Sequence, residues 1–350
     1  ALAAQNFSTA TLSYNTAVGF KAGLSVTTGR ENTILGGLAG DALTTGTQNV
    51  AIGVNALGQE DTSSFNVAIG REALKTQNGG EYNVAIGRTA GMLITTGIQN
   101  TIIGGNAGDA LTDADANVAV GYLALSSDTL GSDSVAIGRS ALESQNFTTA
   151  TAAYNVAVGR SAGVNLTTGV RNTLIGAFSG DALTTGSNNI AIGLNALTTE
   201  DAGDFNIAIG SETLEAQDAG DAYNIAIGYA AGKAMTTGTI NTLIGGECGN
   251  ALTSGNSNTA VGFKALNDDT KGDRNIAIGA GALQVQNFTT STDSHNIAVG
   301  YDAGNDVTTG IFNTIVGGLS GDSLQDADNN TTLGYAALTT DTFGSRSTAI

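Results

Sequence analysis

The apolar and polar positions of the chain follow one short phrase that returns at a fixed interval. Asn66 to Arg71 reads NVAIGR, and Asn83 to Arg88 reads NVAIGR again, seventeen positions later. The glycine that ends the phrase, called the closing glycine below, occurs nineteen times, from Gly19 to Gly334. The spacing is 17 residues except for one step of 18 and two steps of 21. A fixed period near 20 residues is typical of a solenoid, in which each repeat packs only on its neighbours.

The positions just before the closing glycine predict a β-strand. Asn stands four positions before the glycine in 18 of 19 copies, with Ser134 as the exception, and Ile, Val or Leu always stands one position before it. Such a short apolar run, rich in β-branched residues, favours a strand, because a 17-residue unit has no apolar stripe long enough for a helix. We therefore predict that each repeat forms this strand, a tight corner, a short second strand and a return turn, which often reads TTG as at Thr27 to Gly29.

In most copies, both faces of the predicted strand are apolar. Side chains alternate across a strand, so Val67 and Ile69 share one face, and Ala68 and Gly70 share the other. A strand that is apolar on both faces is buried on both faces, yet one coil has a single interior. We therefore expect sister chains to bury the second face in a parallel homotrimer, although the sequence leaves open which face points inward. Stacking at about 4.8 Å would also align the asparagines in an amide ladder at a corner, where Asn tolerates left-handed geometry.

A longer period lies above the single repeat. The residue four positions after the closing glycine runs Gly, Gly, Leu, Leu in turn, and a longer corner that begins with QNF occurs at Gln5, Gln145 and Gln286. We interpret the chain, 1–350, as a single repeat array that is truncated at both ends. The predicted super-repeat has about 140 residues and gives the segments 5–144, 145–285 and a partial 286–350.

Composition agrees with a chain that is hydrogen-bonded along most of its length. It has 50 glycines and no proline, a residue that lacks the N–H needed in a β-ladder. The net charge of −18 disfavours nucleic acid and anionic membranes as partners. No apolar run approaches the roughly 20 residues of a membrane helix, so we expect no membrane insertion. A single cysteine cannot form an internal disulfide.

The phrase NxAIGxxA, as in Asn66 to Ala73 and Asn275 to Ala282, resembles the head repeats of trimeric autotransporter adhesins of the YadA type. With its 17-residue period and TTG-like return turns, it is also similar to repeats of phage tail-fibre proteins. The resemblance covers essentially the whole chain. It implies a trimeric, left-handed parallel β-roll in which three chains pack along a common axis, and it supplies no catalytic residue. Ala or Thr often replaces the bulkier Val of the adhesins, and the longer unit slightly favours the tail fibre.

Few residues offer catalytic or metal-binding chemistry. His295 is the only histidine, and no cysteine cluster accompanies it, so we predict neither a metal site nor a catalytic triad. Cys248 stands where every repeat has a small residue, which indicates a buried, inert thiol. The segments GGLAGDAL (Gly36 to Leu43) and GGNAGDAL (Gly104 to Leu111) resemble calcium-binding nonapeptides, but their period differs and dense carboxylates are lacking. No catalytic, cofactor-binding or metal-binding residue is predicted, and we do not expect an enzyme.

Two further features of the repeats suggest surface roles. Threonine pairs in the return turns raise ice binding as an alternative, but TTG occurs on at most half of the coils. Acidic pairs such as Asp113 and Asp115, or Asp268 and Asp269, are predicted to lie at solvated corners that keep the array soluble and limit sideways association.

The sequence thus predicts a structural trimeric fibre, shaft or head, for attachment to a host or surface. A phage or phage-like tail fibre on the virion surface is the favoured version, and a bacterial surface adhesin is the alternative. The expected partner is the chain itself as a homotrimer, with a cell-surface glycan or protein receptor as a candidate ligand. No cofactor is expected.

Overall fold

The fold is all-β in the residues that a computed structural model of the chain describes, 1–59 and 61–350. These residues form strands, turns and bends, and they contain no helix. The chain divides into two compact units, Ala1–Asn172 and Thr173–Ile350. Each unit is a parallel β-solenoid with one main strand per coil, which confirms the predicted all-β, parallel solenoid.

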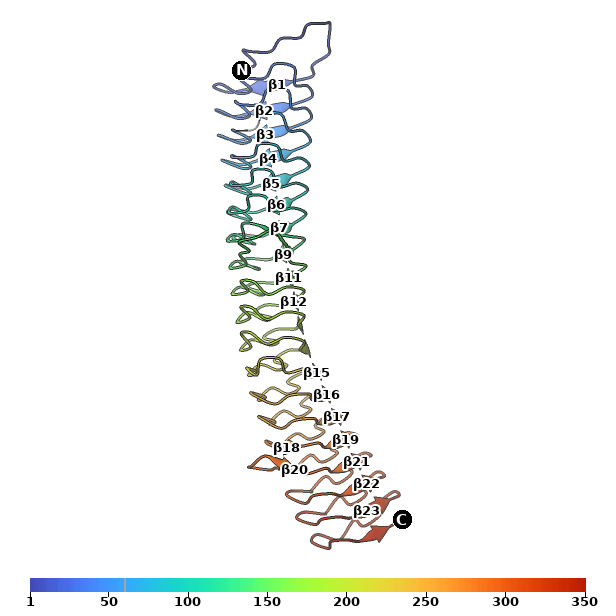
Figure 1. Cartoon of the computed structure of the whole chain (residues 1–350). Helices are drawn as coiled ribbons and strands as arrows, with labels where there is room; N and C mark the ends of the chain where they lie inside the picture. The colour runs from blue at the N-terminus through green and yellow to red at the C-terminus, as the bar shows by residue number, and fades with distance from the viewer. Residues whose placement is uncertain (60) are drawn as a thin grey trace. The chain divides into compact units, whose positions relative to one another are not determined.

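In the first unit, the strands of successive coils lie one above the next (Figure 1). Neighbouring strands are parallel and in register, so that Val67 pairs with Val84 and Ile69 with Ile86. A second pairing joins β8 (Gly131–Ser132) to β10 (Thr151–Ala152) at a long corner. The main strands are β1 (Thr16–Val18), β2 (Thr33–Leu35), β3 (Val50–Ile52), β4 (Val67–Ile69), β5 (Val84–Ile86), β6 (Thr101–Ile103), β7 (Val118–Val120), β9 (Val135–Ile137) and β11 (Val156–Val158).

The second unit repeats this arrangement. Ile190 pairs with Ile207 and Ile192 with Ile209, and β18 (Gly272–Asp273) pairs with β20 (Thr292–Asp293) at a long corner. The main strands are β12 (Thr173–Ile175), β13 (Ile190–Ile192), β14 (Ile207–Ile209), β15 (Ile225–Ile227), β16 (Thr242–Ile244), β17 (Thr259–Val261), β19 (Ile276–Ile278), β21 (Ile297–Val299), β22 (Thr314–Val316), β23 (Thr331–Leu333) and β24 (Thr348–Ala349).

The second strand that the sequence predicts in each coil is not formed. The residues two and four positions after the closing glycine have positive φ, such as 62° at Glu72 and 47° at Leu74, so this segment is a run of turns. The turns still bond coil to coil, since the Leu57 N–H donates to Ala73 O at 3.0 Å. The sequence prediction of a strand was therefore wrong, because alternating left-handed residues break the extended backbone while keeping the vertical hydrogen bonds.

The closing glycine is required by backbone geometry. Gly70 has φ of +135°, and a Cβ added there would overlap the carbonyl oxygen of Gly87 in the next coil. Only glycine adopts this conformation while allowing so close an approach of two backbones. The most regular column of the sequence is therefore the point where each coil turns away from its strand.

Small residues alternate with fully buried large side chains, such as Leu57 and Leu74, in the interior of the coils. Ala68, two positions before the closing glycine, and Ala73, three after it, are fully buried. In another coil, Ile34 stands two positions before the closing glycine in place of alanine, and its side chain lies beside two glycines. A methyl group added at Gly23 would lie 3.0 Å from Ile34 Cδ1, and one added at Gly40 would lie 3.4 Å from it. The glycines four positions after the closing glycine thus leave room for one large side chain in every fourth coil, which explains both period-four patterns.

The predicted asparagine ladder is present and buried. Asn66 Nδ2 donates to Gly80 O at 3.1 Å, and Asn66 Oδ1 accepts the backbone N–H of Asn83 at 3.0 Å. The left-handed geometry belongs instead to the preceding residue, as at Phe65 with φ of 65°. Because an unpaired buried backbone group is costly, the asparagine column satisfies the corner from inside the coil.

Candidate functional site

The outer face of the main strands carries an apolar strip. It consists of the residues three and one positions before the closing glycine and is called the outer strip below. Val67 and Ile69 of β4 belong to it and are partly exposed, whereas Ala68 between them is fully buried. Exposure reaches 57% at Val18 and 47% at Leu35. The alanine face therefore points inward and the isoleucine face outward, a choice that the sequence left open.

Two columns of exposed side chains flank the outer strip. The leading column, five positions before the closing glycine, has left-handed backbone throughout and includes stacked ring pairs. The ring centroids of Phe65 and Tyr82 lie 4.9 Å apart, and those of Phe205 and Tyr223 lie 5.2 Å apart. The trailing column, one position after the closing glycine, carries exposed aromatics such as Tyr122 and a series of arginines. Together with the outer strip, these columns form a broad surface with few compensating polar contacts.

Cys248 and His295, the two residues that the sequence analysis examined for reactivity, both pack against neighbouring residues of the solenoid. Cys248 is fully buried, its Sγ lies 3.3 Å from Ala260 O, and burial raises the pKa of the thiol to about 12. The predicted buried thiol is confirmed, and a thiol that stays protonated is a poor nucleophile. His295 is exposed in the leading column, where its ring stacks on Phe312 with centroids 5.7 Å apart.

Three buried acidic residues, which the sequence analysis missed, each pair with a glutamine of the following coil. Gln286 Nε2 donates to Asp269 Oδ2 at 2.6 Å, and Gln286 Oε1 accepts from Asn296 Nδ2 at 2.8 Å. Asp269 Oδ1 also accepts the Gly272 N–H at 3.0 Å. The prediction that Asp269 lies at a solvated corner is therefore wrong, because its carboxylate points into the coil and joins the amide ladder. The equivalent pairs are Asp128 with Gln145 and Glu200 with Gln217.

A column pattern in the sequence could have revealed these pairs. The residue seven positions after the closing glycine follows a four-coil pattern: apolar, apolar, acidic and Gln. One example is the series Leu166, Leu183, Glu200 and Gln217. The acidic and Gln residues fall in coils with Leu four positions after the glycine, where the interior is already filled. Glu60 occupies the same column but lies outside the described residues.

The long corners are anchored by the same carboxylates. The backbone N–H of Phe147 donates to Asp128 Oδ1 at 3.1 Å, and that of Phe288 donates to Asp269 Oδ1 at 3.2 Å. Both phenylalanines are nearly buried. The QNF sequence thus holds each of these two corners to the preceding coil through one amide side chain, one ring and one backbone bond.

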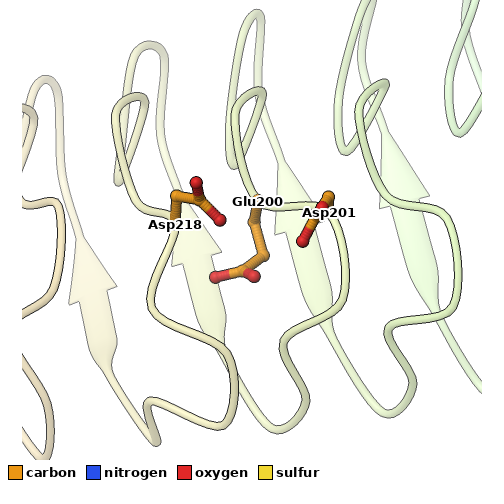
Figure 2. Close-up of side chains that lie close together, drawn as sticks. All are labelled: Glu200, Asp201 and Asp218. Carbon is orange, nitrogen blue, oxygen red and sulfur yellow. The ribbon is translucent and has the colours of Figure 1, made fainter.

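Three carboxylates of the second unit come together around one of these pairs. Oxygens of Glu200, Asp201 and Asp218 lie within 4.8 Å of one another (Figure 2). Glu200 is buried, and its oxygens accept the Gly203 N–H at 2.8 Å and Gln217 Nε2 at 3.1 Å. Its pKa is raised, chiefly by desolvation. Because Glu200 is hydrogen-bonded within the coil, only Asp201 and Asp218 remain as ligands in this group. Their carboxylates supply at most four oxygens, whereas calcium takes six to eight.

The GDAL segments do not gather carboxylates. Asp41 and Asp109 stand four coils apart, which at about 4.8 Å per coil is far beyond the reach of one ion. Asp109 Oδ2 accepts from Asn106 Nδ2 at 3.2 Å, and desolvation raises the pKa of both aspartates. These residues form local turns and do not make a shared cation site.

The return turns use their polar side chains to bond neighbouring coils. Thr44 Oγ1 donates to Asp61 O at 2.9 Å, and Thr253 Oγ1 donates to Thr270 O at 2.9 Å. Asp115 Oδ1 accepts the Ile98 N–H at 2.8 Å, so Asp115 bonds to a coil corner, while Asp113 accepts from Thr96 and is exposed. The threonine hydroxyls therefore satisfy carbonyl groups along the solenoid, which leaves fewer of them for an ice-like array.

The part of the chain that the structure describes has no helix with the length and apolarity to span a bilayer. Comparison with protein families, curated proteins and solved structures finds no match to this chain. The fold class, a parallel β-solenoid with an apolar outer strip, is therefore the basis for the function proposed next.

Proposed function

We propose that this chain is a structural segment of a surface fibre, a left-handed β-roll that assembles as a parallel homotrimer through its outer strip. One observation carries the proposal: in each unit, Ile, Val and Leu side chains are stacked on the outside of the coil. A continuous apolar strip of this length exceeds the exposed patches that soluble monomers tolerate. Removing each side chain from water contributes about 1.5 to 3 kcal/mol at most, so burial repeated in every coil favours assembly strongly.

A structural role fits the chemistry of the described residues. The buried acidic residues, the thiol of Cys248 and the return-turn hydroxyls are used by the coil itself. The exposed surface consists of corners that a fibre can vary without disturbing its interior. We propose a phage or phage-like tail fibre at the virion surface, because of the 17-residue period; a shaft of this kind would hold a receptor-binding or anchoring region away from the particle.

The native mass of the purified chain tests the assembly. We expect three times the 34.8 kDa of one chain in analytical ultracentrifugation at micromolar concentration. Ile69→Asp would place a charge in the outer strip and should lower the midpoint of thermal dissociation of the trimer, while the β-signal in circular dichroism below that midpoint is kept. Thr28→Asp adds the same charge at an exposed return turn and should leave the trimer intact. A stable wild-type monomer would refute the proposal.

A further inference from the structure

The leading and trailing columns are complementary in size within the same coil. In every coil that lies wholly within one unit and has a small trailing residue, the leading residue is long or bulky. In the reverse case the trailing residue is large and the leading one small. The small trailing residues with their leading partners are Gly37 with Glu31, Gly105 with Gln99, Ser211 with Phe205, Gly246 with Ile240, Ala280 with Arg274 and Gly318 with Phe312; the reverse pairs are Tyr122 with Ala116 and Phe263 with Ser257.

Most coils with two large residues combine side chains that attract each other; the coils of Gln48 with Val54 and of Asn188 with Leu194 do not. Arg139 shares its coil with Asp133, and no coil carries like charges in both columns. Guanidinium groups stack well on aromatic rings, and aromatic rings pack on each other. The other pairs of this kind are Phe20 with Tyr14, Arg71 with Phe65, Arg88 with Tyr82, Arg160 with Tyr154, Tyr229 with Tyr223, Tyr301 with His295 and Tyr335 with Asn329.

This complementarity is not used within one chain. A Cβ added at Gly37 would meet no atom within 4 Å, so Glu31 of the same coil does not fill that space. The ion pairs found in residues 1–59 and 61–350 do not include one between Arg139 and Asp133. The two columns lie at opposite ends of the outer strip, with the strand between them. Their matching side chains therefore need a second molecule to meet.

The leading column also includes an apolar residue, Ile240, whose exposure to solvent is unfavourable in the single chain. Ile240 is 61% exposed and has φ of 59°, a backbone conformation that disfavours β-branched side chains. It shares its coil with Gly246, above which the nearest side chain is the ring of Phe263, at 3.5 Å from an added Cβ. If Ile240 of one chain packed against Gly246 of a second copy, both the isoleucine and the neighbouring Phe263 ring of that copy would be buried.

We propose that the trailing column of one chain packs against the leading column of a second copy of this chain, coil for coil at the same height. The inference rests on the homotrimer proposed above and adds its register. In a closed cyclic assembly of parallel chains, all copies lie at equal height, and the opposite ends of neighbouring strips meet. The pairing then fixes the register: a shift of one coil in one direction opposes Gly105 to Ala116 and Arg160 to Arg171, and the reverse shift opposes Ala280 to Ser257.

Cysteine cross-linking tests the register directly. Asp133→Cys and Arg139→Cys are combined in a Cys248→Ala chain, since Ala occupies the position of Cys248 in fifteen of the nineteen repeats. Under mild oxidation we expect disulfide-linked chains on a non-reducing gel, because same-coil pairing brings the two positions of neighbouring chains together. Two offset controls pair Asp133→Cys with Tyr122→Cys or with Arg160→Cys. These should cross-link about tenfold more slowly, because a disulfide requires Cβ atoms about 4 Å apart.

The outcomes separate the register from the trimer. A trimeric native mass with faster cross-linking in an offset control, or with a disulfide inside one chain, would overturn the register and leave the trimer standing. A monomeric native mass would overturn both. A charge exchange gives a second readout: Arg139→Asp should lower the midpoint of thermal dissociation, and adding Asp133→Arg in the same chain should restore it. Absence of rescue would contradict the pairing of these two positions.

Discussion

The inner and outer faces of one strand differ in what they tolerate. In β4, Ala68 faces the interior with no exposed surface, and Val67 and Ile69 face outward with part of their surface accessible. Inside, size is restricted: an isoleucine enters in place of alanine where two glycines leave room for it, as at Ile34. Outside, the position one before the closing glycine is always Ile, Val or Leu, and the position three before it is Val, Ile or Thr. The comparison teaches that the single coil is specified by backbone geometry, by small residues and by the large side chains buried between them, such as Leu57 and Leu74. The large apolar residues of the outer strip, which stay partly exposed, add less to the fold of one chain.

The polar residues show the same division. The inner polar groups are fixed by several hydrogen bonds, such as those of Asn66 and Asp269. The polar groups on the outer rim mostly bond to one neighbour in the next coil, as Thr44 does. Substitutions inside should therefore change the stability of the coil, whereas substitutions outside should change mainly its association.

The largest effect is expected at the closing glycine. In Gly70→Ala, the new methyl group would overlap Gly87 O, and alanine disfavours φ of +135°. We expect a loss of about 4 kcal/mol in the free energy of unfolding, measured by urea denaturation. Thr28→Ala, at an exposed return turn, is the control; it should change stability by less than about 0.5 kcal/mol. Equal losses in both variants would contradict the assigned role of the closing glycine.

A smaller loss is expected in the asparagine ladder. Asn66→Ala removes the acceptor of the Asn83 N–H and the donor to Gly80 O, and both partners stay buried. Gly80 O keeps the hydrogen bond from Gln77 Nε2, so the Asn83 N–H is the group left unsatisfied, and this should cost about 2 kcal/mol in urea denaturation. Gln59→Ala removes an exposed amide and serves as the control, with little change expected. Hydrogen exchange should speed up at Asn83 in the first variant only; unchanged protection there would show that the ladder does not hold this corner.

The sequence predicts those features that depend on residue type at a fixed position within one repeat. The period, the strand before the closing glycine and the small interior position of Cys248 follow from residue type at fixed spacing. The turns after the glycine were mistaken for a strand, because their Ala and Leu residues resemble strand residues, and non-glycine residues such as Leu74 rarely adopt positive φ.

The direction of the two strand faces required the structure. Both faces of β4 are apolar, so alternation alone could not assign the interior; the complete burial of Ala68 and of its in-register partner Ala85 assigns it. The buried role of Asp269 was missed for a different reason. An acidic residue next to Asp268 resembles a surface turn, and the glutamine that accommodates it stands one whole coil later.

The smallest expected effect is the pH dependence of the free energy of unfolding, which has opposite signs for buried and for exposed carboxyl groups. Burial raises the pKa of Asp269 and of Glu200, although several hydrogen bonds oppose it. A folded-state pKa above the unfolded value means that the folded chain keeps its protons to higher pH. The free energy of unfolding should therefore be greatest near or below pH 4 for these two groups, and fall as pH rises through their folded pKa, by at most about 1.4 kcal/mol per pH unit for each carboxyl.

An outer carboxyl gives the opposite sign. Hydrogen bonds from Thr309 and Thr308 lower the pKa of Asp326, so its contribution is present at neutral pH and is lost on acidification. Urea midpoints measured between pH 4 and 7 should show a flatter pH dependence in the double variant Asp269→Asn, Glu200→Gln than in wild type. Asp326→Asn should instead remove a loss of stability at acid pH. If the double variant kept the slope of the wild type, the interior carboxyls would not be its source, and self-repulsion among the exposed charges of this −18 chain would explain the dependence instead.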